Sequence, residues 1–145
     1  MSQFYSGYTE IQTFDGPKWI KDIKVGDLVL THKNRYKKVK SINKSLILDF
    51  NQEIFDLYFV FEDDVKIKEE GIHRIHESSK IILANGRSLE VSKIKPNTLL
   101  QLRKNQRGKV SSILKIPKEN FPDFSYSIEI ESDHSYYADN VCVND

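Results

Sequence analysis

The chain has 145 residues, a length that fits one domain, and we expect residues 1–145 to fold as a single unit. Its 22 lysines and arginines balance 21 aspartates and glutamates, giving a formal net charge of +1. A dedicated nucleic-acid binder usually carries a basic excess, so we expect no nucleic-acid partner. One cysteine, Cys142, excludes an intramolecular disulfide and a cysteine-based zinc site.

The ends of the sequence show no targeting signal. The opening MSQFYSGYTEI has no charged segment followed by an apolar run, so it is not a secretory signal. No stretch approaches the roughly 18 apolar residues of a membrane span. We therefore expect a soluble, intracellular (cytoplasmic) monomer with no membrane partner.

Short apolar segments of period two, separated by turn signals, dominate the chain and predict a mostly β protein. Turn signals include Asp15-Gly16, Asn85-Gly86 and Pro117. Only Trp19–Ile23 and Ser88–Ile94 could hold a turn or two of helix. In chain order, the predicted strands are Lys24–Thr31, Tyr36–Ile42, Ile54–Phe61, Val65–Lys68, Lys80–Leu83, Leu99–Leu102, Val110–Leu114 and Tyr126–Ile130.

An internal repeat joins two of these regions. Asp15-Gly16 is followed by a short apolar segment, a tight turn at Gly26 and a strand, and Asn85-Gly86 is followed by a similar series through Asn97 to Leu100. The repeat could reflect a fold of two related halves, or only the common grammar of β hairpins. The polar segment 103–109 (RKNQRGK) is predicted to be an exposed connection where insertion or cleavage is tolerated.

Histidines are the main candidates for chemistry. His73 and His76 lie three residues apart and could present two nitrogens to a metal, but no cysteine or third ligand accompanies them, so we predict no metal site. A catalytic imidazole is more plausible, because histidine titrates near neutral pH. The chain also finishes on Asn144 and Asp145, two side chains that can cyclise onto their own backbone.

Four motifs in order make the sequence similar to inteins, the self-splicing members of the Hint superfamily. They are Tyr5–Ile11, the stretch from Thr13 to Leu30 (TFDG…IKDIKVGDLVL), Glu62-Asp63 through Ile67 to His73, and Ile128–Ala138 with the closing VCVND. The resemblance implies an all-β, pseudo-twofold horseshoe of bent antiparallel strands with one or two short helices. The length implies a minimal intein without a homing endonuclease, whose natural insertion or split point would fall at 103–109.

The resemblance also assigns catalytic positions, several of them atypical. The first position, normally cysteine or serine, falls on Phe4; Ser2 or Ser6 would serve only if the opening segment were longer or shorter. His73 and His134 match the two conserved histidines. Glu70 replaces a threonine or serine, and Ser127 replaces an aspartate.

At the C-terminal end, Asn144 stands at the penultimate histidine and Asp145 at the terminal asparagine. Within the resemblance, His73 would polarise the upstream scissile amide, while His134 and Asn144 would orient the attacking Asp145. Because Phe4 has no nucleophile, C-terminal cleavage is the easiest step to imagine.

The implied function is autocatalytic splicing or terminal cleavage of a host precursor, a single-turnover rearrangement rather than multi-turnover catalysis. It needs no metal, nucleotide or other cofactor, and its partners are the flanking extein segments of the precursor. The sequence leaves open a splicing-inactive Hint scaffold or a binding module resembling half of a split intein. The compact, lysine-rich sequence hints at a phage or bacterial host.

Overall fold

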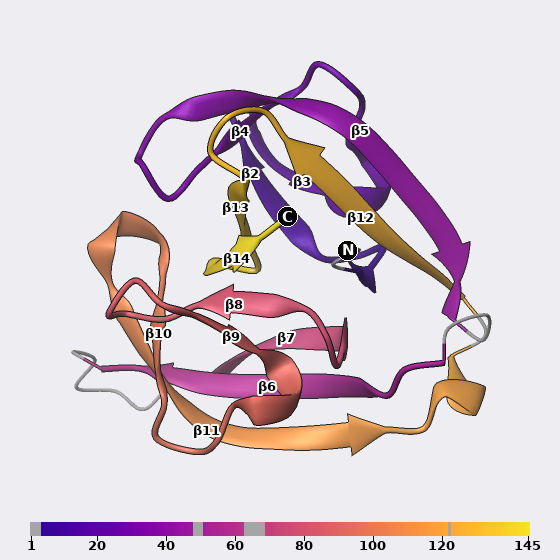
Figure 1. Cartoon of the computed structure of the whole chain (residues 1–145), viewed down its shortest axis with the longest axis vertical. Helices are drawn as coiled ribbons and strands as arrows, with labels where there is room; N and C mark the ends of the chain where they lie inside the picture. The colour runs from indigo at the N-terminus through magenta and orange to yellow at the C-terminus, as the bar shows by residue number, and fades with distance from the viewer. Residues whose placement is uncertain (1–3, 48–50, 63–68, 122) are drawn as a thin grey trace.

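The computed structural model describes residues 4–47, 51–62, 69–121 and 123–145, and strands dominate it (Figure 1). Its strands are β1 (Tyr5–Ser6), β2 (Glu10–Thr13), β3 (Gly16–Trp19), β4 (Leu28–Leu30), β5 (Tyr36–Leu46), β6 (Ile54–Phe61), β7 (Glu69–His76), β8 (Lys80–Ile82), β9 (Ser88–Glu90), β10 (Leu99–Gln101), β11 (Arg107–Ile116), β12 (Phe124–Ile130), β13 (Ser135–Ala138) and β14 (Val141–Asn144). The short 3₁₀ turns are η1 (Ile20–Asp22), η3 (Val91–Lys93), η4 (Arg103–Asn105) and η5 (Lys118–Asn120). The predicted all-β class is confirmed. In these ranges no helix is long and apolar enough to span a bilayer.

Two antiparallel sheets build the molecule. The larger has the order β1-β12-β5-β4-β2-β13-β14-β8-β9, with β3 paired to β2, and the smaller has the order β10-β11-β6-β7. The long strands β5 and β12 run side by side across one half, and β11 and β6 across the other (Figure 1). The C-terminal hairpin β13–β14 joins the halves, because β13 pairs with β2 and β14 with β8.

The internal repeat corresponds to a real pseudo-twofold relation. In the first half β4 pairs with β5 and β5 with β12; in the second half β10 pairs with β11 and β11 with β6. The tight turns match in detail: Val39 N–H donates to Asp27 O, and Val110 N–H donates to Thr98 O, both at 2.9 Å. The structure thus has the pseudo-twofold horseshoe expected from the resemblance, and equivalent turns in the two halves make equivalent hydrogen bonds.

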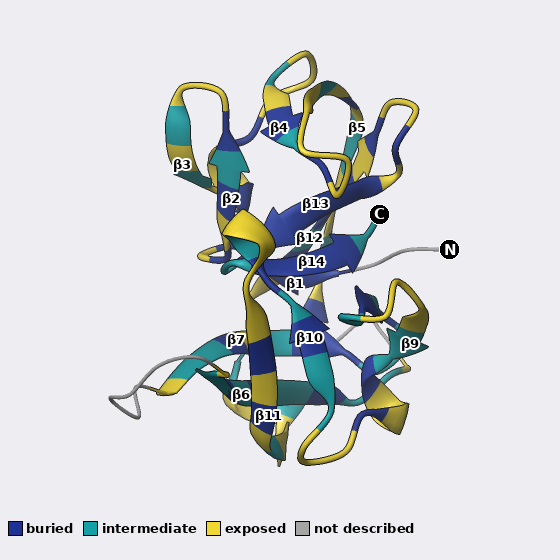
Figure 2. Ribbon diagram, turned by 90° about the vertical axis from the view of Figure 1, so that its left-hand side faces the viewer, coloured by how far each residue is buried: buried dark blue, intermediate teal, exposed yellow. Residues whose placement is uncertain are grey.

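Both halves share one apolar core. It contains Ile11 and Val29 from the first half, Phe59 and Leu100 from the second, and Val141 from the joining hairpin, all fully buried. Burying such side chains stabilises the fold by about 1.5–3 kcal/mol each. Figure 2 shows this buried layer continuing through β13 and β14.

Several predicted elements need correction at their bounds. The segment Trp19–Ile23 holds only η1, and Ser88–Ile94 is a strand followed by η3, not a longer helix. The polar segment 103–109 is an exposed connection only as far as Gln106, because β11 begins at Arg107 and pairs with β10. The predicted strand Val65–Lys68 lies outside the described residues.

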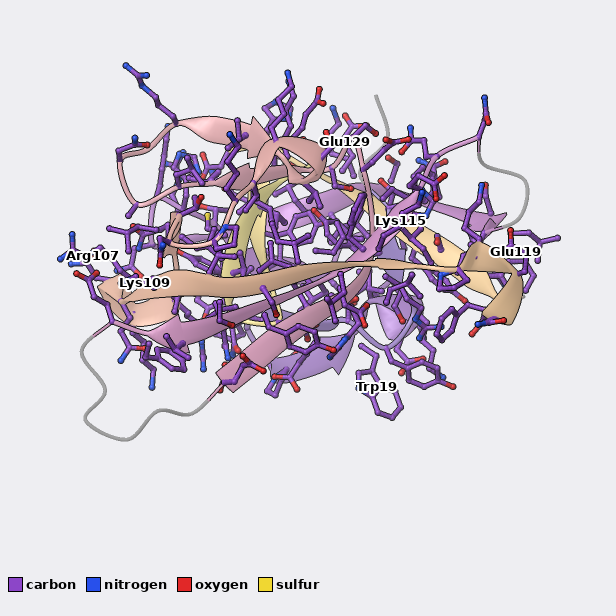
Figure 3. All side chains as sticks on the ribbon, turned by 90° about the horizontal axis from the view of Figure 1, so that it is seen from below. Trp19, Arg107, Lys109, Lys115, Glu119 and Glu129 are labelled. Atoms are coloured by element: carbon purple, nitrogen blue, oxygen red, sulfur yellow. The ribbon has the colours of Figure 1, made fainter. Side chains whose placement is uncertain are left out.

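Strand β11, which lies between β10 and β6, carries three basic side chains. Figure 3 shows Lys109 and Lys115 along this strand, with Trp19 projecting from another part of the molecule. Two of the charged groups on β11 are paired: Arg107 Nε with Glu62 at 3.0 Å and Lys115 with Glu53 at 3.6 Å. Such exposed pairs contribute little to stability.

We predict that Gly108→Ala lowers the free energy of unfolding by about 1–3 kcal/mol. A Cβ at this position on β11 would lie 2.8 Å from the Phe59 ring, closer than real Cβ atoms approach, and 3.0 Å from Leu102, which is also a tight contact. Denaturant unfolding measures the difference. The neighbouring Ser111→Ala, at an exposed site on the same strand, is the control and should change stability little.

Candidate functional site

The N-terminal candidate position is occupied by a packed aromatic side chain. Phe4 is 5% exposed, and its ring lies 5.6 Å from that of His76. His76 N–H also donates to Phe4 O at 3.4 Å. Ser6 is buried and accepts a hydrogen bond from Arg74 at 2.6 Å, and Ser2 lies outside the described residues. A buried phenyl ring therefore occupies the position at which the resemblance to inteins implies a nucleophile.

His76, not His73, is the histidine in contact with Phe4. It is 1% exposed, and its Nε2 lies 2.9 Å from Ser125 Oγ. Burial, helped by the positive charge of Lys118, lowers the pKa of His76 to about 4. Sequence reasoning treated it only as a metal-site alternative. Strand alternation in the sequence could not have singled it out, because a β-bulge lies between His73 and His76.

His73 and Glu70 lie on β7 but take other partners. His73 is half exposed and pairs with Asp56, Nδ1 to Oδ2 at 3.4 Å, while its ring stands edge-on to Tyr58. Glu70 accepts a hydrogen bond from Asn140 at 3.4 Å. A β-bulge opposite Asp56 sets Arg74 in the left-handed region, with φ +52°. His73 therefore belongs to a separate polar group, not to the surroundings of Phe4.

His73 and Asp56 line a pocket. Its other lining residues are Ser6, Tyr8, Thr9, Arg74, Phe121 and Asp139. Asp139, at the turn between β13 and β14, accepts the Glu10 N–H at 2.8 Å. Burial raises the pKa of Asp139 to about 6, against the effect of that hydrogen bond.

At the C-terminal end, His134 and Asp145 come together as the sequence suggested. His134 Nδ1 lies 3.2 Å from Asp145 Oδ2, and the same carboxylate oxygen accepts the Ile130 N–H at 2.7 Å. Asp145 N–H donates to His134 O at 3.0 Å. Asn144 does not join them, because it accepts a hydrogen bond from Ser88 on β9. One carboxylate oxygen of Asp145 thus contacts both a backbone N–H and an imidazole.

A clamp holds the loop that carries His134. Ser132 and His134 both adopt left-handed backbone, φ +64° and +53°, which is costly for residues with a side chain. Between them, the buried Asp133 carboxylate accepts hydrogen bonds from Arg35 Nε at 2.9 Å and from Thr31. These donors hold the pKa of Asp133 well below its usual range, the Arg35 bond being the largest cause.

The two ends of the site meet through aromatic rings. Tyr5, next to Phe4, stands edge-to-face with Tyr136 of β13 at 6.1 Å between centroids. Tyr136 pairs across the hairpin with Val143, two residues before Asp145. Strand β1, which follows Phe4, therefore contacts β13, the first strand of the hairpin that leads to Asp145.

Among the described residues, no group of three or more histidine, cysteine, aspartate or glutamate side chains could hold a metal ion. The groups that could take part in chemistry here are a buried histidine, a carboxylate beside an imidazole, and hydroxyl groups.

The two related halves, joined by the β13–β14 hairpin, have the arrangement of a Hint-type fold. No family model matches the chain, and no curated protein matches it. Solved structures do. A bacterial intein-like domain from Clostridium thermocellum matches with a TM-score of 0.77 and 19% identity, covering 100% of this chain and 99% of that one. The gp41-1 intein gives 0.73 and 22%, with 100% and 99% covered, and the MchDnaB-1 intein gives 0.70 and 14%, with 97% and 98% covered.

The chain thus has the intein fold. Because these matches run almost from end to end on both sides, it is the fold of a minimal intein, without an inserted endonuclease domain.

We predict that the contribution of His76 to stability is lost as pH drops from about 6.5 toward 4, a window in which the raised pKa of Asp139 acts in the opposite direction. The folded pKa of His76, about 4, lies below the unfolded value of 6.5, so the unfolded state binds the proton first. The full loss for this one group approaches about 3 kcal/mol. Chemical denaturation between pH 4 and 7 measures it. The stability of wild type relative to His76→Gln should decrease toward low pH, and a difference that does not change with pH would contradict the assignment.

Proposed function

We propose that this chain is an autocatalytic, intein-type self-processing domain whose remaining reaction is cleavage of the peptide bond after Asp145. The observation that carries the proposal is the His134–Asp145 contact, with the carboxylate fixed by the Ile130 N–H. A reacting group held in place beside its own backbone converts cyclisation into a well-oriented intramolecular step. The intein fold of the chain supports the same reaction class.

The reaction can be written with this chain's own groups. An Asp145 carboxylate oxygen attacks the carbonyl carbon of Asp145, and the bond from that carbon to the following nitrogen breaks. The leaving amine takes a proton, for which His134 is the adjacent donor. The product is a cyclic anhydride of Asp145, which water opens to the free acid, plus a downstream segment with a new amino terminus. No cofactor is needed in this scheme.

The upstream step is not available in the usual form. Phe4 offers no hydroxyl or thiol, and its side chain fills the space against His76. Full splicing therefore needs a nucleophile that Phe4 cannot supply. In this proposal, the partners of the chain are the flanking segments of a host precursor, and we expect a cytoplasmic monomer in a phage or bacterial host.

The test is a fusion of residues 1–145 between two reporter domains, with serine as the first downstream residue, followed by intact mass spectrometry. The expected result is release of the downstream reporter, with the upstream reporter still attached. His134→Gln should slow the release and Asp145→Ala should abolish it. Joined reporters would show that another residue, such as Ser2 or Ser6, starts a complete splicing pathway.

An unchanged precursor would instead favour a Hint scaffold without chemistry. The buried Phe4 ring favours this inactive scaffold, because a packed phenyl group stabilises the fold and performs no reaction. Such a scaffold would serve as a binding module for a partner strand.

A further inference from the structure

A second pocket, of about 520 Å³, lies on one face of the C-terminal hairpin, and the reaction above does not use it. Its apolar floor is formed by Leu30 of β4, Ile82 of β8 and Tyr137 of β13, which pack together with the buried Cys142. Tyr136, the residue before Tyr137 on the same strand, belongs instead to the main core. The pocket therefore lies on the side of the hairpin that faces away from that core.

Two equivalent turns, one from each half, supply walls of this pocket. The β4–β5 turn contributes Asn34 and the β10–β11 turn contributes Asn105. Each turn is closed by a backbone hydrogen bond of 2.9 Å, donated by Thr31 in the first half and by Leu102 in the second. Each asparagine follows its donor at the same spacing, and both adopt left-handed backbone, with φ +56° and +57°. The two turns lie in opposite halves of the molecule (Figure 1), so the pseudo-twofold relation brings two carboxamide groups to one pocket.

The polar groups of this pocket favour an anion. Asn34 and Asn105 carry carboxamide N–H donors, and Lys104 adds an ammonium group. His32 also lines the pocket, with its Nδ1 held 2.6 Å from Ser135 Oγ. Among the described residues that line the pocket, none carries a carboxylate. Small-molecule sites are mostly apolar with a few polar groups that fix the orientation of the ligand. This lining thus matches a molecule with an apolar body and one negative group.

We propose that this pocket binds a small aromatic anion, a carboxylate or sulfonate on a flat apolar body. The rings lie on the floor against Tyr137, and the negative group accepts hydrogen bonds from Asn34, Asn105 and Lys104. Charge-assisted hydrogen bonds of this kind are stronger than neutral ones. Because the walls come from both halves, the bound anion connects the two halves, and binding raises the melting temperature of the protein. The site is independent of the cleavage proposed above.

The experiment titrates the whole chain with two probes that share a ring system. Anilinonaphthalene sulfonate carries a negative charge and fluoresces in apolar surroundings, and N-phenylnaphthylamine lacks the sulfonate. We expect one binding site for the sulfonate, with a Kd of about 10–100 µM for a ligand of this size. The neutral probe should bind at least about fivefold more weakly, which is the effect of about one hydrogen bond. This preference should shrink at about 1 M salt, where charges are screened.

Glycine substitutions remove the two carboxamides without disturbing the turns. Glycine adopts left-handed backbone readily, so Asn34→Gly and Asn105→Gly should remain folded. Each should weaken binding of the sulfonate about fivefold, and Lys104→Gln about threefold, while binding of the neutral probe should change little. Asn97→Gly is the matched control, because Asn97 is also left-handed, with φ +75°, but is exposed in a turn and is not among the residues that line the pocket.

Three results would overturn this inference. The first is equal affinity for the charged and neutral probes at low salt. The second is an affinity for the sulfonate that stays unchanged in both pocket glycine variants, or that falls as far in Asn97→Gly. The third is a dimer, seen by sedimentation of the chain alone, that the sulfonate or Asn34→Gly dissociates, because a second copy would then be what covers the pocket. The reporter fusion is unaffected by any of these outcomes, so the proposed function stands or falls separately.

Discussion

Replacing Asp133 with alanine is expected to lower the free energy of unfolding by about 3 kcal/mol, because it removes several hydrogen bonds to a buried charge. The carboxylate is fully buried and joins Arg35 and Thr31 to the loop after β12. Without it, Ser132 and His134 would keep their left-handed backbone with no anchor between them. Denaturant unfolding at pH 7 measures the loss.

The charge of Asp133 makes the effect depend on pH. Its folded pKa lies below the unfolded value, so its contribution is present at neutral pH and is lost as pH falls below about 4 and through the folded value. Asp133→Asn keeps the shape of the side chain and should remove this acid-dependent loss. Glu131→Ala, at an exposed position in the same loop, is the control.

The reporter fusion adds a second measurement on the same variants. If the clamp positions His134 against Asp145, the Asp133→Ala fusion should release its downstream reporter more slowly at a temperature where the domain remains folded. Unchanged stability in Asp133→Ala would show that solvent satisfies Arg35 equally well, and the clamp would then have no structural role.

The fold was largely predictable because its turns and long strands follow simple rules. Ile54–Phe61 was predicted with the observed bounds, and the glycines at 16, 26 and 86 all adopt positive φ in the turns that the sequence marked. The paired Gly16 and Gly86 turns also revealed the two related halves. Local chemistry was enough, because a residue without a Cβ is the natural choice for such backbone.

Strands without alternation were harder to find. All four residues of β13 and the first three of β14 are buried, because this hairpin lies between the two halves and has no solvent-facing side. A strand covered on both faces shows no period of two. The charged β7 was missed for a different reason: its glutamates and histidines suggest a solvated loop, and pairing with β6 makes it a strand.

The candidate site shows the limit of position matching. His134 and Asp145 were brought together as expected, because their spacing corresponds to one hairpin. His73 and His76 could not be told apart without knowing which face of β7 meets Phe4, and a bulge at Arg74 changes that alternation. Tertiary pairing decides such cases, and one sequence carries little information about it.

Asp145→Asn is expected to accelerate C-terminal cleavage at least about tenfold, which corresponds to an activation barrier lower by about 1.4 kcal/mol. An amide nitrogen closes a five-membered succinimide, a stable ring, whereas the carboxylate must form an anhydride. The geometry should survive, because the asparagine Oδ1 can still accept the Ile130 N–H that now bonds to the carboxylate. Intact mass spectrometry of the fusion gives the rate and shows the succinimide as a loss of one water from the released domain.

Two further variants determine what limits the reaction. Asn144→His alone should change the rate little, because the side chain at 144 is directed toward Ser88 rather than toward Asp145. Phe4→Cys added to Asp145→Asn supplies an upstream thiol beside His76, and upstream cleavage by an added thiol reagent would reveal the thioester. If Asp145→Asn releases the reporter no faster than wild type, the carbonyl of residue 145 is not within reach of its own side chain, and the His134–Asp145 contact is structural.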